Sequence, residues 1–152
     1  MVVDELPSAD PGAGDAGDAV VLRWADDPRC VGRARAALRE ALMGWGLSAI
    51  EDSALVILSE LLTNAGRHAC VPERGIETRF FRMLGGLRIE VHDGSCKLPR
   101  LTTPDGDQGS GRGLWLVDVL ADRWDVGERK GLGKVVWAEL SVPTAGGERH
   151  AW

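Results

Sequence analysis

Apolar residues recur at helical spacing in the first half of the chain. A short apolar run at 20–24 predicts a strand, and the helical pattern begins after Asp27 and Pro28, which suit the cap and the first turn of a helix. Gly44 and Gly46 are expected to end this helix, because glycine is favoured where a helix stops.

A second helix is expected from Ser48 to about Ala69. Ser48 and Glu51 stand three residues apart, which is the spacing of a capping box, and Pro72 closes the segment. Within this helix the stretch 54–65 is apolar except for four polar residues that fall on one side: Ser59, Glu60, Thr63 and Asn64.

Alternation of apolar and polar residues predicts strands in the second half of the chain. Residues 76–83 and 87–93 are joined by Gly85-Gly86, which is typical of a tight hairpin. In 87–93 the odd positions are apolar and the even positions are polar, so one face of this strand is expected to be buried. Residues 94–110 hold almost no apolar residues and are interpreted as a long loop of the kind that forms lids.

A third helix is expected over 113–122, a strand from 123 and a last strand over 134–142. This order favours an α+β fold, a two-layer sandwich in which a mixed, mostly antiparallel sheet is covered by helices on one face. The last strand carries apolar residues on both faces, so one face is a candidate dimer seam.

Length and composition limit the alternatives. The 152 residues suffice for one domain, expected at 19–143 between a flexible acidic tail at 1–18 and a C-terminal tail at 144–152. The net charge of −5 argues against direct nucleic-acid binding, which needs Lys and Arg. No apolar run reaches the length of a membrane span, no secretory signal is visible, and the separated cysteines lack a paired motif, so we expect a cytoplasmic protein without membrane contact.

The polar side of the second helix has two interpretations. It is either a solvated stripe or the wall of a cleft. Glu60 and Asn64 are four residues apart and therefore lie one turn apart on the same face. An amide oxygen is a ligand for a hard cation, and a carboxylate beside it is a possible base.

Asp93 falls on the buried side of its strand and therefore needs a hydrogen-bond donor. The exocyclic amine of a purine is one candidate donor, and the backbone amides of a local Asp-Gly turn are the other. A third feature, Gly109-Ser-Gly-Arg-Gly-Leu114, lies directly before a helix. At this place the backbone amides of the segment could bind an anion, or the segment could serve as the hinge of a lid.

These three features in this order resemble the motifs of the GHKL ATPases, whose fold is also called the Bergerat fold. Residues 60–68 resemble the N-box, Asp93 the first G-box, and residues 111–117 the second. Within that superfamily, the short chain and the run 113–124 resemble the bacterial anti-sigma-factor serine/threonine kinases of the RsbW type.

The resemblance implies ATP and Mg²⁺ as cofactors. Asn64 would hold the Mg²⁺, Glu60 would be the catalytic base, and Asp93 would bind the adenine amino group. Further nucleotide contacts are implied for a set of residues around these positions: Arg67, His68, Gly94, Gly111, Arg112, Gly113 and Leu114.

The resemblance also implies partners. The chain would sequester a sigma factor and phosphorylate a serine of an anti-sigma-factor antagonist, regulating transcription as a homodimer. The alternative is a non-catalytic ATP-binding module that sequesters a sigma factor or another partner.

Overall fold

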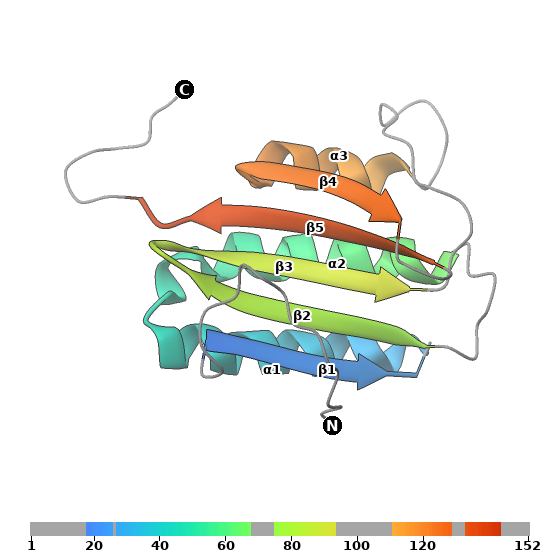
Figure 1. The fold of residues 1–152 in the computed structure, drawn as a ribbon, viewed down its shortest axis with the longest axis horizontal. Helices are drawn as coiled ribbons and strands as arrows, with labels where there is room; N and C mark the ends of the chain where they lie inside the picture. The colour runs from blue at the N-terminus through green and yellow to red at the C-terminus, as the bar shows by residue number, and fades with distance from the viewer. Residues whose placement is uncertain (1–17, 26, 68–74, 94–110, 129–132, 144–152) are drawn as a thin grey trace.

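The computed structural model describes residues 18–25, 27–67, 75–93, 111–128 and 133–143 (Figure 1). The elements follow the predicted order: β1 (Ala19–Trp24), α1 (Arg29–Trp45), the one-turn 3-10 helix η2 (Ser48–Ile50), α2 (Glu51–Arg67), β2 (Ile76–Met83), β3 (Gly86–Asp93), α3 (Gly111–Leu120), β4 (Arg123–Glu128) and β5 (Lys134–Ser141). The expected tails, up to residue 17 and from residue 144, and the expected lid at 94–110 lie outside the described residues.

The five strands form one sheet in the order β1-β2-β3-β5-β4. Each neighbouring pair is antiparallel, which confirms the expected character of the sheet. The helices α1, α2 and α3 lie together behind the sheet in the view of Figure 1, so the fold is the predicted two-layer sandwich. None of the helices in the described ranges is both long and apolar enough to cross a membrane.

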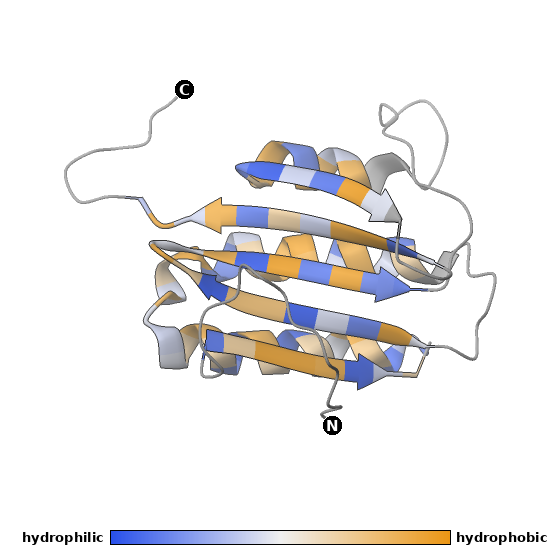
Figure 2. Ribbon diagram, in the orientation of Figure 1, coloured by the Kyte–Doolittle hydropathy of each residue, from blue (hydrophilic) through white to orange (hydrophobic). Residues whose placement is uncertain are grey.

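The hydrophobic core lies between the sheet and the helices. Alternate residues of β3 and β5 point into it, and Figure 2 shows the matching alternation of hydropathy along these strands. Leu38 of α1, Leu58 of α2 and Val117 of α3 are fully buried against this sheet face. Each helix therefore contributes one apolar face to a shared core.

The ends of α1 follow the sequence closely. The Asp27 carboxylate accepts the backbone amide of Arg29 at 2.8 Å, and hydrogen bonds from Arg29 lower the pKa of Asp27 to about 2. Gly46 ends the helix with φ 73°, in the left-handed region that favours glycine, whereas Gly44 lies inside the helix.

Two local predictions are wrong by small shifts. Ser48 begins η2 rather than capping α2, which starts at Glu51 with two acidic residues in its first turn. The β2–β3 hairpin turns at Leu84-Gly85, and Gly86 is already paired with Met83. Gly86 is required there for another reason, because a Cβ on it would lie 2.4 Å from the backbone oxygen of Leu140.

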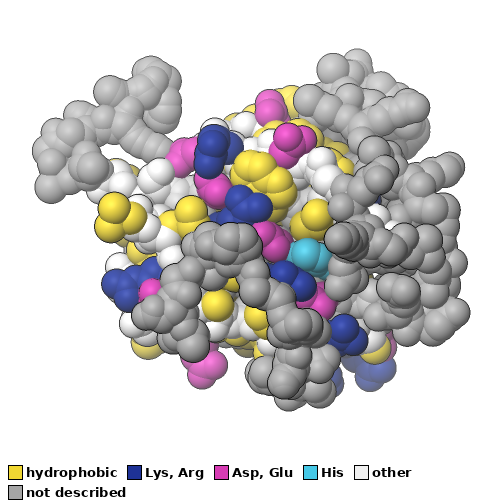
Figure 3. Space-filling view, in the orientation of Figure 1, with side chains coloured by type: hydrophobic (Ala, Val, Ile, Leu, Met, Phe, Trp, Pro, Cys, Tyr) yellow, Lys and Arg dark blue, Asp and Glu magenta, His cyan; other side chains and the backbone are white. Residues whose placement is uncertain are grey.

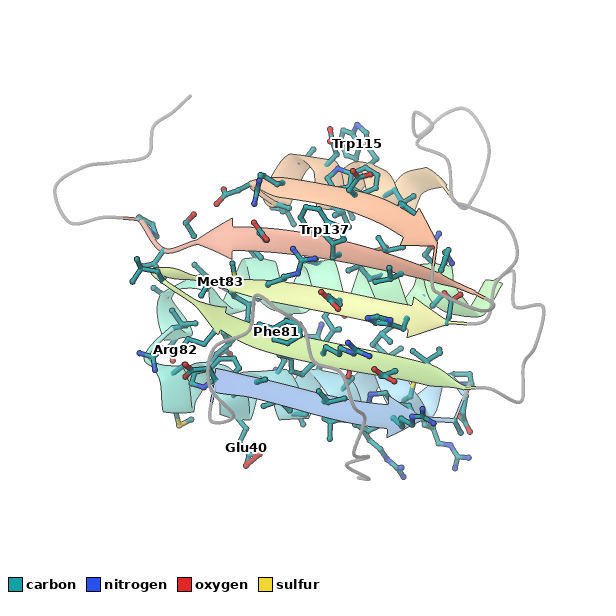
Figure 4. All side chains as sticks on the ribbon, in the orientation of Figure 1. Glu40, Phe81, Arg82, Met83, Trp115 and Trp137 are labelled. Carbon is teal, nitrogen blue, oxygen red and sulfur yellow. The ribbon has the colours of Figure 1, made fainter. Side chains whose placement is uncertain are left out.

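The sheet face opposite the helices carries charged side chains (Figure 3). Arg88 donates to Glu90 at 2.8 Å and to Glu139 at 2.7 Å, and His92 lies 2.9 Å from Glu90. Trp137 lies on this face, as Figure 4 shows, and Arg88 stacks on its ring. The apolar face suggested as a dimer seam therefore includes a tryptophan that an arginine already contacts, and the dimer itself stays a prediction.

Candidate functional site

Four chain positions that carry candidate site residues gather at one end of the fold. The last turn of α2, the last residue of β3, the first turn of α3 and the first residue of β5 all lie at the same end of the sandwich (Figure 1). Antiparallel pairing explains part of this, because it places the start of β5 beside the end of β3. The packing of α2 against α3 and β3 supplies the rest.

The polar side of α2 is not one uniform surface. Asn64 is only 5% exposed, Glu60 is half-buried, and Thr63 is exposed. The interpretation of the whole stripe as solvated is therefore wrong for Asn64. The Oδ1 atom of Asn64 is buried and accepts no hydrogen bond within the described part of the chain.

Ser59 belongs to a different contact from its neighbours in the stripe. Its hydroxyl donates to the backbone oxygen of Leu55 at 2.9 Å and receives a hydrogen bond from Arg35 of α1 at 2.7 Å. Ser59 thus joins α1 to α2, and the candidate site retains Glu60 and Asn64. Among the described residues, Glu60 forms no hydrogen bond or ion pair, so its carboxylate is available to another group.

Asp93 has a donor that the sequence interpretation did not name. Its Oδ2 atom lies 2.8 Å from Nζ of Lys134, and both side chains are 2% exposed. Asp93 and Lys134 are Cα partners in the β3–β5 ladder. The carboxylate is therefore buried as expected, but an ammonium of the chain itself already compensates its charge, and Asp93 makes a further interaction besides this one.

The glycine-rich segment meets α3 at Gly111, so Gly111, Arg112 and Gly113 form the first turn of that helix. The first amides of a helix have no partner within it, and the helix dipole adds positive character there. Leu114 is 1% exposed and packs in the core, where it fixes this turn against the sheet side of the fold.

The structure describes the remaining predicted site residues only in part. His68 and Gly94 lie outside the described residues, and Arg67 is placed only as the last residue of α2. Lys134 was not predicted as a site residue. Its signal in the sequence is a lysine at an inward position of a strand whose other inward residues are apolar: Val136, Ala138 and Leu140.

The residues present fit a nucleotide with a magnesium ion. A buried amide oxygen without a hydrogen-bond donor is a suitable ligand, and Mg²⁺ in nucleotide sites takes few protein ligands because phosphates and water complete its shell. The first turn of α3 offers amides to an anion at the same end of the fold. Within the described ranges, no cluster of three or more His, Cys, Asp or Glu side chains forms a metal cage of its own.

Comparisons with known proteins show the family to which the chain belongs. No curated protein matches the sequence. A similar solved structure is the histidine kinase domain from the blue-light activated histidine kinase EL346 of Erythrobacter litoralis, with 23% identity and a TM-score of 0.48. That match covers 76% of this chain and 60% of the other. The model of the histidine kinase-like ATPase domain matches residues 24–140, so the chain belongs to this family of kinase-like domains that bind ATP.

Proposed function

We propose that the chain is an ATP- and Mg²⁺-dependent protein kinase that phosphorylates a serine of an anti-sigma-factor antagonist and also sequesters a sigma factor. The observation that carries the proposal is the pairing of two side chains on α2. Glu60 has no partner within the described chain, and one turn later Asn64 presents a buried, unbonded amide oxygen. This pairing places a candidate base beside a candidate metal ligand.

ATP would supply the γ-phosphoryl group: the serine oxygen would form a bond to the γ-phosphorus while the bond from this phosphorus to the β–γ bridging oxygen breaks and ADP leaves. Mg²⁺ would neutralise charge on the phosphates. Asn64 would hold the ion through Oδ1, and the amides at Gly111 and Gly113 would bind phosphate oxygens. Glu60 would accept the proton of the incoming serine hydroxyl. Glu60 suits this role because its carboxylate forms no hydrogen bond or ion pair with the described residues.

The partners are proposed from the resemblance described above and not from a contact in the fold. A sigma factor and its antagonist are proteins, and a homodimer in the cytoplasm is the form in which we expect the chain to act on them. The alternative, a non-catalytic ATP-binding module, shares the nucleotide contacts and lacks the proton transfer at Glu60.

The test is transfer of labelled phosphate from ATP to purified candidate antagonists. We expect the wild type to phosphorylate one of them and Glu60→Gln, which keeps the shape of the side chain, to bind ATP without transfer. Asp52→Asn is the matched control, because it removes an exposed carboxylate from the first turn of the same helix. Absence of transfer by the wild type to every candidate, with ATP and sigma factor still bound, would establish the non-catalytic alternative.

A further inference from the structure

A buried lysine that the proposed chemistry does not use lies at the same end of the sheet. Lys134 is the first residue of β5, its residue surface is 1% exposed, and its Nζ atom lies 2.8 Å from Oδ2 of Asp93. Lysine is almost never fully buried unless it is paired. The preceding residue, Gly133, has φ 121°, a conformation that residues other than glycine rarely adopt. The backbone directly before Lys134 therefore requires glycine.

The ammonium of Lys134 has more N–H donors than the described residues accept from. A lysine carries three N–H donors. Among the described residues, Asp93 is the one group to which Nζ donates. A buried donor without an acceptor is costly, so a ligand atom that accepts from Nζ would gain a strong, charge-assisted hydrogen bond.

The pair Asp93–Lys134 therefore presents an acceptor and a donor side by side. The Watson–Crick edge of adenine has the complementary order, because its N6 amino group donates and the adjacent N1 accepts. A carboxylate alone would recognise N6 and leave N1 without a donor from the protein. The flexible four-carbon stem of lysine allows Nζ to stay near the carboxylate while it reaches a second acceptor.

We propose that Lys134 is a base-contacting residue that donates to adenine N1, while Asp93 accepts from N6. This assignment rests on the proposed ATP-binding function and adds to it a residue that determines which base is bound. A lysine that served only to neutralise Asp93 would be insensitive to the chemistry at N1, and this difference separates the two roles.

The test compares two nucleotides that differ at one atom. ATP and 1-deaza-ATP share the 6-amino group, but the second carries C–H in place of N1. We expect the wild type, titrated in a calorimeter with Mg²⁺, to bind 1-deaza-ATP about tenfold or more weakly than ATP, because a hydrogen bond from a charged donor is lost.

The informative variant is the double substitution Asp93→Asn with Lys134→Met. The single change Lys134→Met would leave a buried carboxylate without its counter-ion, which destabilises the fold. The double variant removes both charges and the ammonium donor at residue 134. It keeps an acceptor at residue 93, where the introduced amide also carries neutral N–H donors. We expect it to bind ATP more weakly than the wild type and to prefer ATP over 1-deaza-ATP by a smaller factor, because the charged donor to N1 is gone. Arg39→Met, which removes an exposed cation from α1, is the matched control and should discriminate as the wild type does.

The possible results separate the two proposals. Equal binding of both nucleotides by the wild type overturns the role of Lys134 and leaves ATP binding intact, and this comparison needs no variant to fold. A preference for ATP that is as large in the double variant as in the wild type also overturns it, because Lys134 then contributes nothing to the recognition of N1. Failure of the folded wild type to bind ATP at all overturns the proposed function and this assignment with it.

Discussion

The guanidinium of Arg88 lies over the ring of Trp137, with 4.2 Å from its central carbon to the ring centroid. The two residues come from the adjacent strands β3 and β5, on the sheet face away from the helices. Arg88 also binds Glu90 and Glu139, so one side chain joins a stacking contact to two ion pairs. An arginine suits this position because its planar group stacks and donates at the same time.

Replacement of this arginine should lower the stability of the fold. Arg88→Met keeps much of the stem but removes the donors to Glu90 and Glu139, whose side chains are 9% and 14% exposed. We expect the free energy of unfolding in urea to fall by about 1–3 kcal/mol, since two largely buried carboxylates each lose one charged donor and keep only His92 or Arg123 among the described residues. In Arg39→Met, which breaks an ion pair with side chains 48% and 31% exposed, the loss should stay below about 1 kcal/mol. Equal losses in the two variants would contradict the importance of the buried network.

The same network predicts how stability depends on pH. Burial alone would raise the pKa of Glu139, but hydrogen bonds from Arg123 and Arg88 outweigh it and lower that pKa below the ordinary 4.5. Burial alone would also raise the pKa of Glu90, but hydrogen bonds from His92 and Arg88 outweigh it and lower that pKa. Below pH 4.5 the unfolded chain therefore binds protons that the folded chain does not bind, so these groups stabilise the fold above that pH and lose their effect as the pH falls further.

Urea unfolding at pH 6 and at pH 3 measures this effect. We expect the wild type to lose stability between the two values and Glu139→Gln to lose less, so that the two proteins become more alike at the lower pH. A constant difference between them at both pH values would show that the ionisation of Glu139 does not contribute.

Periodicity predicted those parts of the fold that local sequence determines. The alternation at 87–93 placed Leu87, Ile89, Val91 and Asp93 on the buried side, and all four are 2% exposed or less. The cap at Asp27 and the stop at Gly46 were predicted for the same reason, because each depends on residues within one helical turn.

What the sequence did not predict depends on contacts between distant residues. Asp93 and Lys134 are 41 positions apart, and their pairing follows from the β3–β5 register, which no local pattern encodes. The burial of Asn64 likewise requires α2 to pack against its neighbours, so spacing alone left open whether the stripe was solvated. The sequence placed Gly86 in the turn because a pair of glycines usually marks a turn. In the structure, glycine is needed at this position because the backbone of β5 approaches it closely.

Two glycines give opposite predictions for the same substitution. Gly86→Ala would place a Cβ 2.4 Å from the backbone oxygen of Leu140, which neither strand can avoid without moving. We expect a loss of about 1–3 kcal/mol in the free energy of unfolding. Gly32 is the fourth residue of α1, and beyond its chain neighbours and the backbone of its own helix no atom lies within 4 Å of the added Cβ, so Gly32→Ala should stabilise by up to about 1 kcal/mol. Thermal unfolding of the two variants checks both signs.

Substitution of Asn64 is expected to weaken ATP binding without lowering the thermal stability of the fold. Its Oδ1 atom is buried and accepts no hydrogen bond from the described residues, so the amide oxygen contributes little to the folded state by itself. Asn64→Leu keeps a similar volume and removes that oxygen, and replacement of an unbonded polar group by an apolar one of the same shape is nearly neutral. We therefore expect thermal unfolding close to that of the wild type, together with Mg²⁺-dependent ATP binding weakened about tenfold or more.

Asn64→Asp is the conservative comparison, because it restores an oxygen ligand at the same place and should recover part of the Mg²⁺-dependent binding. Thr63→Ala, at the exposed neighbouring position, should leave both stability and binding unchanged. Calorimetric titration of ATP with and without Mg²⁺ distinguishes the possibilities. If Asn64→Leu unfolds at a much lower temperature, the amide has a structural role. If it binds ATP with Mg²⁺ as the wild type does, the ion is held elsewhere. Loss of binding in an intact fold is the result expected of a ligand, because no donor among the described residues satisfies this buried oxygen in the absence of an ion.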